Sequence, residues 1–302
     1  MIQYTGTKWQ QIKKAKMCYL FVLPFLLLFL TFVVIPVLVA FVFAFTDFNM
    51  LEAPNFVGFD NFYRMFLEDD TFITAVRNTM VFAVVTGPLS YFACLIFAWL
   101  INELSPVVRS ILTVILYLPS MSSMIYVIWT FIFSGDQYGV LNTILMQLNL
   151  IIEPMQWLTD ADTILPVIIF VQLWLSLGTS FLSFIAGLQN VNSELYEAAA
   201  VDGVNNRWQE VFYVTLPSMG PQLLFGAVMQ ISAAFSVGAI CTTLAGFPST
   251  DNAALTIVTH ITDYGNTRME LGYACAMSLV LFIVVFIVNN IIQGIIRRHT
   301  DV

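Results

Sequence analysis

Six long apolar runs without a single Asp, Glu, Lys or Arg dominate this sequence of 302 residues. A helix needs about 20 apolar residues to cross a hydrocarbon core that is about 30 Å thick, and each run reaches that length. The runs cover residues 17–45, 78–101, 111–133, 164–187, 221–245 and 272–296. They predict an all-α membrane protein with six transmembrane helices.

The composition excludes several classes of protein. Hydrophobic residues make up 59% of the chain and charged residues only 10%, against roughly 45–50% and 25% in soluble domains. With a net charge of −8 and no long basic tract, the chain lacks the positive surface that nucleic-acid binding needs. Its four cysteines stand at no metal-ligand or redox spacing, so we expect buried free thiols, no metal and no cofactor.

Charged residues beside the runs predict the orientation in the membrane. Lysines 8, 13, 14 and 16 precede the first run, and no small-residue cleavage site closes that run, so we expect an uncleaved first helix. With the N-terminus inside, eight of the eleven basic residues lie inside, in agreement with the positive-inside rule. Six crossings then place both termini in the cytoplasm. Residues 1–302 are expected to form one transmembrane domain.

The acidic residues fall mainly outside on this topology. The cytoplasmic segments sum to 8 − 6 = +2 and the external segments to 3 − 13 = −10. The external loops, residues 46–77, 134–163 and 246–271, also carry aromatic, glycine and proline residues. These loops could form a docking face for a partner.

One cytoplasmic segment, residues 193–217, has the pattern of a helix, a turn and a second helix. Capping residues flank both helices. They are Asn192 or Ser193 before the first helix, Gly203 after it, and Asn206 with Gln209 at the start of the second. Three alanines follow Glu197 and give a smooth helix face that suits a partner's groove. A short hairpin packed on its own membrane domain is the alternative.

The same segment resembles the EAA loop of the permease subunits of binding-protein-dependent ABC importers. The resemblance rests on Glu197-Ala-Ala, Gly203 and the closing Leu216-Pro217. Ten residues separate Gly203 from Val214, one more than the family commonly has, and the extra residue bears on the register of the second helix. Further matches are Tyr19-Leu-Phe-Val-Leu-Pro24, Asn78-Thr79, Tyr117-Leu-Pro119 and Asp202-Gly203. Over nearly its whole length the chain looks like a type I sugar importer permease of the maltose and glycerol-phosphate class.

The resemblance implies the type I ABC importer permease fold in a bacterial-type plasma membrane. It implies a second permease, two ATPase subunits and an external solute-binding protein that delivers a sugar or oligosaccharide. The positions that match the ATPase-coupling residues of the family are Glu197, Ala198, Ala199, Asp202 and Gly203. This chain has no phosphate-binding loop of its own, so we expect a permease and not an enzyme.

Polar side chains within the third, fourth and fifth runs are the candidates for a substrate path. Polar groups in a bilayer tend to face a cavity or another helix, and uncharged hydroxyl, amide and aromatic groups suit a neutral sugar. The candidates are Ser120, Ser123, Tyr126, Gln172, Trp174, Ser176, Thr179, Gln230 and Ser236. Hydrogen bonding between neighbouring helices is the alternative role for each of them.

Other functions have less support in the sequence. An ion-coupled secondary transporter or channel is the alternative, but proton relays normally need an intramembrane carboxylate, and the runs contain none. An intramembrane enzyme lacks candidate catalytic residues, because the only histidines are His260 and His299. We interpret His260 as a solvated loop residue without a role. A subunit that only supplies walls to the assembly is a further possibility.

Overall fold

The computed structural model describes residues 16–122 and 125–300 and shows an all-α protein. Within these ranges the only β pairing is an isolated bridge between Thr46 and Phe56. Four helices are long and apolar enough to cross a membrane, or up to six if each bent helix pair counts as one span. The predicted all-α membrane fold is therefore confirmed, whereas the side on which the termini lie stays a prediction.

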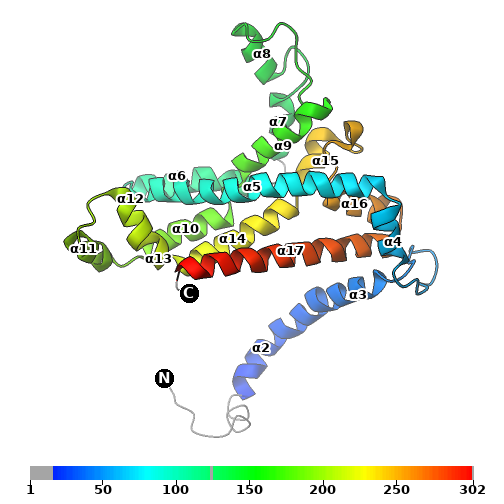
Figure 1. The fold of residues 1–302 in the computed structure, drawn as a ribbon, viewed down its shortest axis with the longest axis horizontal. Helices are drawn as coiled ribbons and strands as arrows, with labels where there is room; N and C mark the ends of the chain where they lie inside the picture. Colours follow the sequence, from blue (N-terminus) through cyan, green and yellow to red (C-terminus); the bar gives the residue numbers. More distant parts are fainter. Residues whose placement is uncertain (1–15, 123–124, 301–302) are drawn as a thin grey trace.

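Two long helices, α5 and α17, run along the molecule, and α14 packs on both of them from its place between them (Figure 1). Helix α5 spans Asp70–Asn102, α14 spans Gly220–Phe235 and α17 spans Leu271–Thr300. The 33 residues of α5 correspond to about 50 Å at 1.5 Å per residue, longer than a hydrocarbon core. Helix α5 therefore extends beyond the predicted run of residues 78–101.

Three of the predicted runs contain a break in the helix. The third consists of α6 (Pro106–Tyr117), a 3₁₀ turn (Leu118–Met121) and α7 (Tyr126–Ile132). The fourth divides into α9 (Ala161–Leu175) and α10 (Thr179–Gln189), and the fifth into α14 and α15 (Ala239–Ala245). Gly178 and Gly238 lie at the latter two breaks with non-helical backbone angles. A broken helix leaves backbone groups without an intrahelical partner, and such groups occur at membrane depth only where protein or a cavity satisfies them.

The first span stands away from the bundle (Figure 1). It comprises α2 (Lys16–Phe29), a π-helical turn (Leu30–Val34) and α3 (Ile35–Phe43), and none of these elements contains a buried residue. Helix α3 packs on α17, where the Phe41 and Phe282 rings lie 6.2 Å apart. Cys18 on α2 is consequently exposed and Cys275 is half-buried, so the expectation of buried thiols is confirmed only for Cys94 and Cys241, although all four are free. An apolar helix with this exposure needs lipid or another membrane subunit to cover it.

The segments that are predicted to be external contain short helices. They are α4 (Asp60–Leu67), α8 (Val140–Gln147), η5 (Thr250–Asn252), α16 (Ile257–Thr262) and the π-helical turn η6 (Asp263–Thr267). The fully buried Asn142 organises the loop around α8, because it accepts hydrogen bonds from Trp157 Nε1 at 2.8 Å and Met155 N at 3.2 Å. This loop therefore has its own polar centre.

The apolar core is divided along the length of the bundle. An outer cluster joins α9 and α15, and an inner cluster joins α10, α14 and the second half of α5. Members of the outer cluster include Ile164, Ile168, Val171, Ile240, Cys241 and Leu244. Members of the inner cluster include Cys94, Phe181, Phe184, Leu188, Met219 and Leu223. The break after α9 contributes Leu177 to the inner cluster, and the break after α14 contributes Val237 to the outer cluster.

Candidate functional site

The loop between α10 and α14, residues 193–217, begins with a capped helix. Helix α11 spans Ser193–Val201, and the side-chain oxygen of Asn192 accepts a hydrogen bond from the backbone N–H of Glu194 at 3.1 Å. Such a cap satisfies one of the free N–H groups in the first turn and typically stabilises a helix by about 1 kcal/mol. The predicted cap is confirmed, and Asn192 rather than Ser193 supplies it.

The turn after α11 depends on Gly203. Its φ angle is +93°, in the left-handed region that residues with a Cβ rarely adopt. The backbone N–H of Val204 then reaches back to the carbonyl of Ala199 at 2.9 Å, and that of Gly203 to Ala200 at 3.3 Å. These bonds satisfy carbonyl groups at the helix end. The predicted left-handed C-cap is thus confirmed.

The second half of the loop contains a widened helical turn. Asn206 caps α12 (Arg207–Glu210) by accepting from Trp208 N at 3.1 Å, and a π-helical turn, η4 (Val211–Thr215), precedes α13 (Leu216–Ser218). A π-helical turn holds more residues than an α-helical one. It therefore accommodates the extra residue between Gly203 and Val214 while Leu216 and Pro217 continue the helix.

Contacts inside the loop hold its two helices together. The Tyr196 hydroxyl lies 2.9 Å from Thr215 Oγ1. The Thr215 hydroxyl in turn donates a hydrogen bond to the carbonyl of Glu210 at 3.2 Å. The ring of Trp208 lies 5.2 Å from that of Trp99 on α5. The loop is consequently attached to the end of the bundle as a folded unit, at the end where α17 finishes (Figure 1).

The outer face of the loop is left free for a partner. Glu197, Ala198, Asp202 and Gly203 are exposed and Ala199 is half-buried, so the five candidate coupling residues occupy one helix and the turn that ends it. Large apolar groups flank them, since the side chains of Trp208, Phe212 and Tyr213 are exposed as well. This surface combines carboxylates, a smooth alanine face and aromatic groups.

One ion-pair network lies at the base of the loop. The Arg207 guanidinium is 2.9 Å from the carboxylate of Glu210 and 3.4 Å from that of Glu103 at the end of α5. The hydrogen bond that Arg207 donates to Glu210 and the charge of Glu103 raise the pKa of Arg207 above its ordinary value. Exposed pairs of this kind contribute little stability, so the network mainly orients the loop.

The candidate path residues at the helix breaks are accessible. Ser120 in the 3₁₀ turn, Thr179 at the start of α10 and Ser236 at the end of α14 are all exposed. A Cβ added to Gly178 would lie 3.5 Å from the Cβ of Ser120. The break in the third run is therefore in contact with the break between α9 and α10. Ser123 lies outside the described residues. Broken spans with exposed polar groups are where membrane transporters commonly bind solutes.

An aromatic group lies above these breaks on α7 and α9. The rings of Trp129 and Trp174 are 5.2 Å apart and nearly perpendicular, and Trp174 keeps 42% of its surface exposed. Tyr126 and Gln172 are half-buried on the same two helices. A partly exposed indole suits the apolar face of a sugar ring.

Two candidate path residues are instead bonded inside the protein. The Ser176 hydroxyl donates to the carbonyl of Leu173 at 2.6 Å, and the Gln230 amide donates to the carbonyl of Ser176 at 3.2 Å. Both residues are buried, with Gln230 only 6% exposed. In this conformation the Gln230 side chain joins α14 to the end of α9, and the Ser176 hydroxyl is bonded within α9. Neither side chain faces a path.

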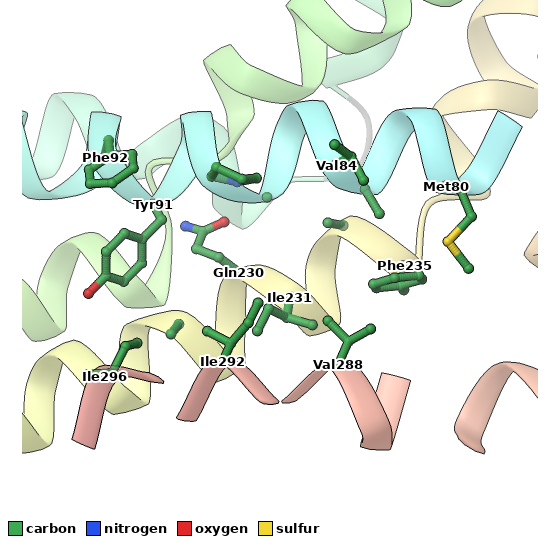
Figure 2. A pocket seen from close by; sticks show the side chains of 15 residues that line it. Met80, Val84, Tyr91, Phe92, Gln230, Ile231, Phe235, Val288, Ile292 and Ile296 are labelled. Carbon is green, nitrogen blue, oxygen red and sulfur yellow. The ribbon is translucent and has the colours of Figure 1, made fainter. Parts of the chain in front are cut away.

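Gln230 also lines a cavity of about 420 Å³ between α5, α14 and α17 (Figure 2). Figure 2 shows Gln230 reaching from α14 toward α5 at the back of this cavity. Its lining includes Met80, Val84, Phe92, Ile231, Val288 and Ile292. These groups offer a sugar almost no hydrogen bonds, so the cavity is not a candidate for the solute path.

The end of the molecule that carries α4 and α16 contains a buried charged group that the sequence did not reveal. His260 is only 2% exposed, and its Nε2 lies 2.9 Å from Asp69 Oδ2, which also accepts from the Tyr273 hydroxyl at 2.8 Å. Burial opposes ionisation of Asp69, but hydrogen bonds from Thr71, His260, the backbone of Phe72 and Tyr273 together hold the pKa of Asp69 below its ordinary value. The interpretation of His260 as a solvated loop residue is wrong, because α16 packs it against α5 and α17.

Comparisons with known proteins agree on one family. Residues 91–301 match the family model described as "Binding-protein-dependent transport system inner membrane component". The probable ABC transporter permease protein YesP of Bacillus subtilis is 31% identical over 280 residues, which cover 91% of this chain and 88% of that protein. The arabinooligosaccharides transport system permease protein AraP of the same species is 31% identical over 275 residues, with 90% and 86% covered.

A solved structure shares the fold over almost the full length. It is a crystal structure of a bacterial alginate ABC transporter in complex with an alginate pentasaccharide-bound periplasmic protein. One of its chains matches with a TM-score of 0.80 and 26% identity, and the match covers 98% of this chain and 99% of that one.

Proposed function

This chain is a permease subunit of an ABC importer, because it belongs to the family of binding-protein-dependent transport system inner membrane components, and we propose that its substrate is a neutral oligosaccharide. It is a multi-pass protein of the bacterial plasma membrane, and it is not an enzyme, since the ATPase in this family is a separate subunit. It works with a second permease, two ATPase subunits and an external solute-binding protein. The assembly of the solved alginate transporter with its periplasmic protein supports these partners.

The observation that supports coupling to the ATPase is the folded loop between α10 and α14. Its capped helix α11 and the left-handed turn at Gly203 present Glu197 and the alanine face outward. A compact helical plug that is wedged in an ATPase can turn rigid-body closure of that partner into movement of the attached spans. We call residues 193–217 the coupling loop.

The oligosaccharide is supported by the chemistry of the broken spans. The predicted runs contain no Asp, Glu, Lys or Arg, so the path has no formal charge with which to bind an anionic sugar. Exposed Ser120, Thr179 and Ser236 supply hydroxyl groups, and Trp174 supplies an aromatic face. The relative AraP is named for arabinooligosaccharides, which are neutral. An ion-coupled transporter is not favoured, since the spans hold no carboxylate and the family uses ATP.

The path can be tested in proteoliposomes that contain both permeases, the ATPase and the binding protein. The solutes are labelled arabino-oligosaccharides and alginate oligosaccharides of equal length, with and without ATP. We expect ATP-dependent uptake of the neutral solute only. Uptake of the uronic-acid oligosaccharide at an equal rate would contradict the assignment of a neutral substrate, and uptake without ATP would contradict the importer.

The coupling loop can be tested by charge reversal. Glu197→Lys places a cation where the helix offers a carboxylate, and we expect the ATPase to be lost on purification of the complex. The matched control is Glu153→Lys, which makes the same change on an exposed external residue. Full ATPase stoichiometry and full transport in Glu197→Lys would contradict the coupling role.

A further inference from the structure

The break between α9 and α10 leaves a carbonyl group at membrane depth without a helical partner. Ser176 caps the end of α9, and its carbonyl accepts a hydrogen bond from the backbone N–H of Gly178 at 2.8 Å. Because a carbonyl has two lone pairs, it can accept further bonds. Ser176 is buried, so water does not provide them.

Side chains from two other helices bond to this carbonyl. Gln230 Nε2 on α14 donates to it at 3.2 Å, and the Cys94 thiol on α5 donates at 3.3 Å. The same Gln230 nitrogen also lies 3.2 Å from Cys94 Sγ. Three helices therefore meet at one buried polar group, which we call the Ser176 junction.

A second contact fastens α10 to α14 beside the junction. The Ser180 hydroxyl donates to the carbonyl of Gly226 at 3.3 Å. The ring of Phe184 lies so close to Gly226 that an added Cβ would come within 2.3 Å of it. Both contacts belong to the inner half of the bundle. Helices α10 and α14 are the two helices that the coupling loop connects.

The outer halves of the same spans are held by different partners. Helices α9 and α15 pack on each other in the outer cluster. The carbonyl of Val237, in the break after α14, accepts a hydrogen bond from the hydroxyl of Thr256, the cap of α16, at 2.7 Å. A Cβ on Gly238 would lie 2.7 Å from Val258 Cγ1. The outer halves thus belong to the external end of the molecule.

We infer that Gln230 is a positioning residue of the transport cycle, which holds the Ser176 carbonyl at the α9–α10 break against α14, so that α10, the coupling loop and α14 form one moving body. This body bends against the outer halves at residues 176–178 and 236–238. The inference rests on the proposed function, because the ATPase supplies the movement. Without the Gln230 donor, α14 loses its hydrogen bond to the α9–α10 break at the Ser176 junction, and the movement of the loop is lost before it reaches the outer halves.

The buried thiol of Cys94 is a reporter for the junction, because alkylation of a thiol depends on its exposure. The experiment uses the complete complex of two permeases and ATPase in lipid nanodiscs, without nucleotide and after trapping with ATP and vanadate. One background keeps only Cys94, by Cys18→Ser, Cys241→Ser and Cys275→Ser. Two others replace Cys94 by Ser as well and carry Thr179→Cys or Ser236→Cys at the breaks. The probe is N-ethylmaleimide.

We expect Cys94 to stay equally protected in both states, because the body moves as a unit. We expect the labelling rate of the cysteines at positions 179 and 236 to change by about fivefold or more on trapping, because the breaks bend. A change in Cys94 labelling on trapping would overturn the inference, and so would equal labelling of both break positions in the two states. These outcomes require no Gln230 variant.

The role of Gln230 itself is tested by Gln230→Met, which keeps the length and removes the donor. We expect Cys94 labelling in the trapped state to rise by about fivefold, and vanadate trapping no longer to alter the labelling at position 179. The control is Gln222→Met on the same helix, which should behave as the parent protein. Unchanged labelling in Gln230→Met would overturn the assignment. A complex that never contains the ATPase would instead refute the proposed function.

Discussion

Gly203 allows the energetic basis of the coupling loop to be measured. Its φ of +93° is in the left-handed region, where a residue with a Cβ costs about 1–2 kcal/mol. No atom lies within 4 Å of the position of an added Cβ. Gly203→Ala therefore introduces no clash in this chain, and its whole effect is the backbone cost of the turn.

That cost determines how often the loop has its binding conformation. Since 1.4 kcal/mol corresponds to a factor of ten in an equilibrium constant, about 1–2 kcal/mol predicts a weakening of ATPase binding by about 5- to 30-fold. The assay is titration of the permease pair in nanodiscs with labelled ATPase. Gly203→Asn is the matched variant, because asparagine tolerates the left-handed region better, and we expect it to bind with intermediate affinity.

The control is Gly294→Ala, at a helical position in α17 that also has open space around its Cβ. It should leave ATPase binding unchanged, because alanine favours a helix. The reasoning would be refuted if Gly203→Ala bound the ATPase as tightly as the parent protein. It would also be refuted if Gly203→Asn were weaker than Gly203→Ala, because the effect would then follow side-chain size and not backbone conformation.

Further changes test other parts of the structure. Asn192→Ala removes the cap of α11 and should weaken ATPase binding by up to about tenfold, in line with a cap energy of about 1 kcal/mol. Hydrogen exchange of the α11 backbone measures the fraying of this helix, and an unchanged exchange rate would contradict the role of the cap. Asp69→Asn should lower the melting temperature at neutral pH, because the buried His260 loses its partner. The pKa of Asp69 is lowered on folding, so its contribution is complete above the ordinary value near 4 and falls as the pH drops further; a difference in melting temperature that grew below pH 4 would contradict this sign. Trp174→Ala and Gln172→Ala should each reduce uptake of a neutral oligosaccharide while its binding to the solute-binding protein stays fixed. An unchanged uptake rate in both variants would show that neither residue lines the path.

Local features of the sequence predicted much of the fold. A run without charges over the length of a bilayer allows few structures except a membrane helix, so the all-α membrane fold followed from the sequence. The caps at Asn192 and Asn206 and the left-handed turn at Gly203 depend on neighbours within four residues. Such short-range geometry can be inferred from residue types alone.

Contacts between distant residues could not be predicted in this way. Asp69 and His260 are 191 positions apart, and nothing near His260 in the sequence indicates that α16 buries it. Gln230 and Ser176 are polar residues in apolar runs, which fits a solute path and a bond between helices equally well. The structure places their hydrogen-bonding groups against each other. Only the packing of the helices separates these alternatives.

The exposure of the first span was also hidden in the sequence. The run of residues 17–45 is as apolar as the others, yet α2 and α3 contain no buried residue. Apolar character shows that a helix enters the bilayer, but it does not say which protein surface covers the helix. A second permease and lipid are the available partners in the proposed assembly.

The most direct measurement of the coupling role is a crosslink from the loop to the ATPase. Ala198→Cys on α11, carrying a photoactivatable thiol reagent, is irradiated in the complete complex. We predict one major product that joins this chain to the ATPase subunit. Tyr138→Cys on the external loop, an exposed position, should give no such product. Absence of the ATPase crosslink from position 198 in a complex that contains the ATPase, or an equal crosslink from position 138, would contradict the account.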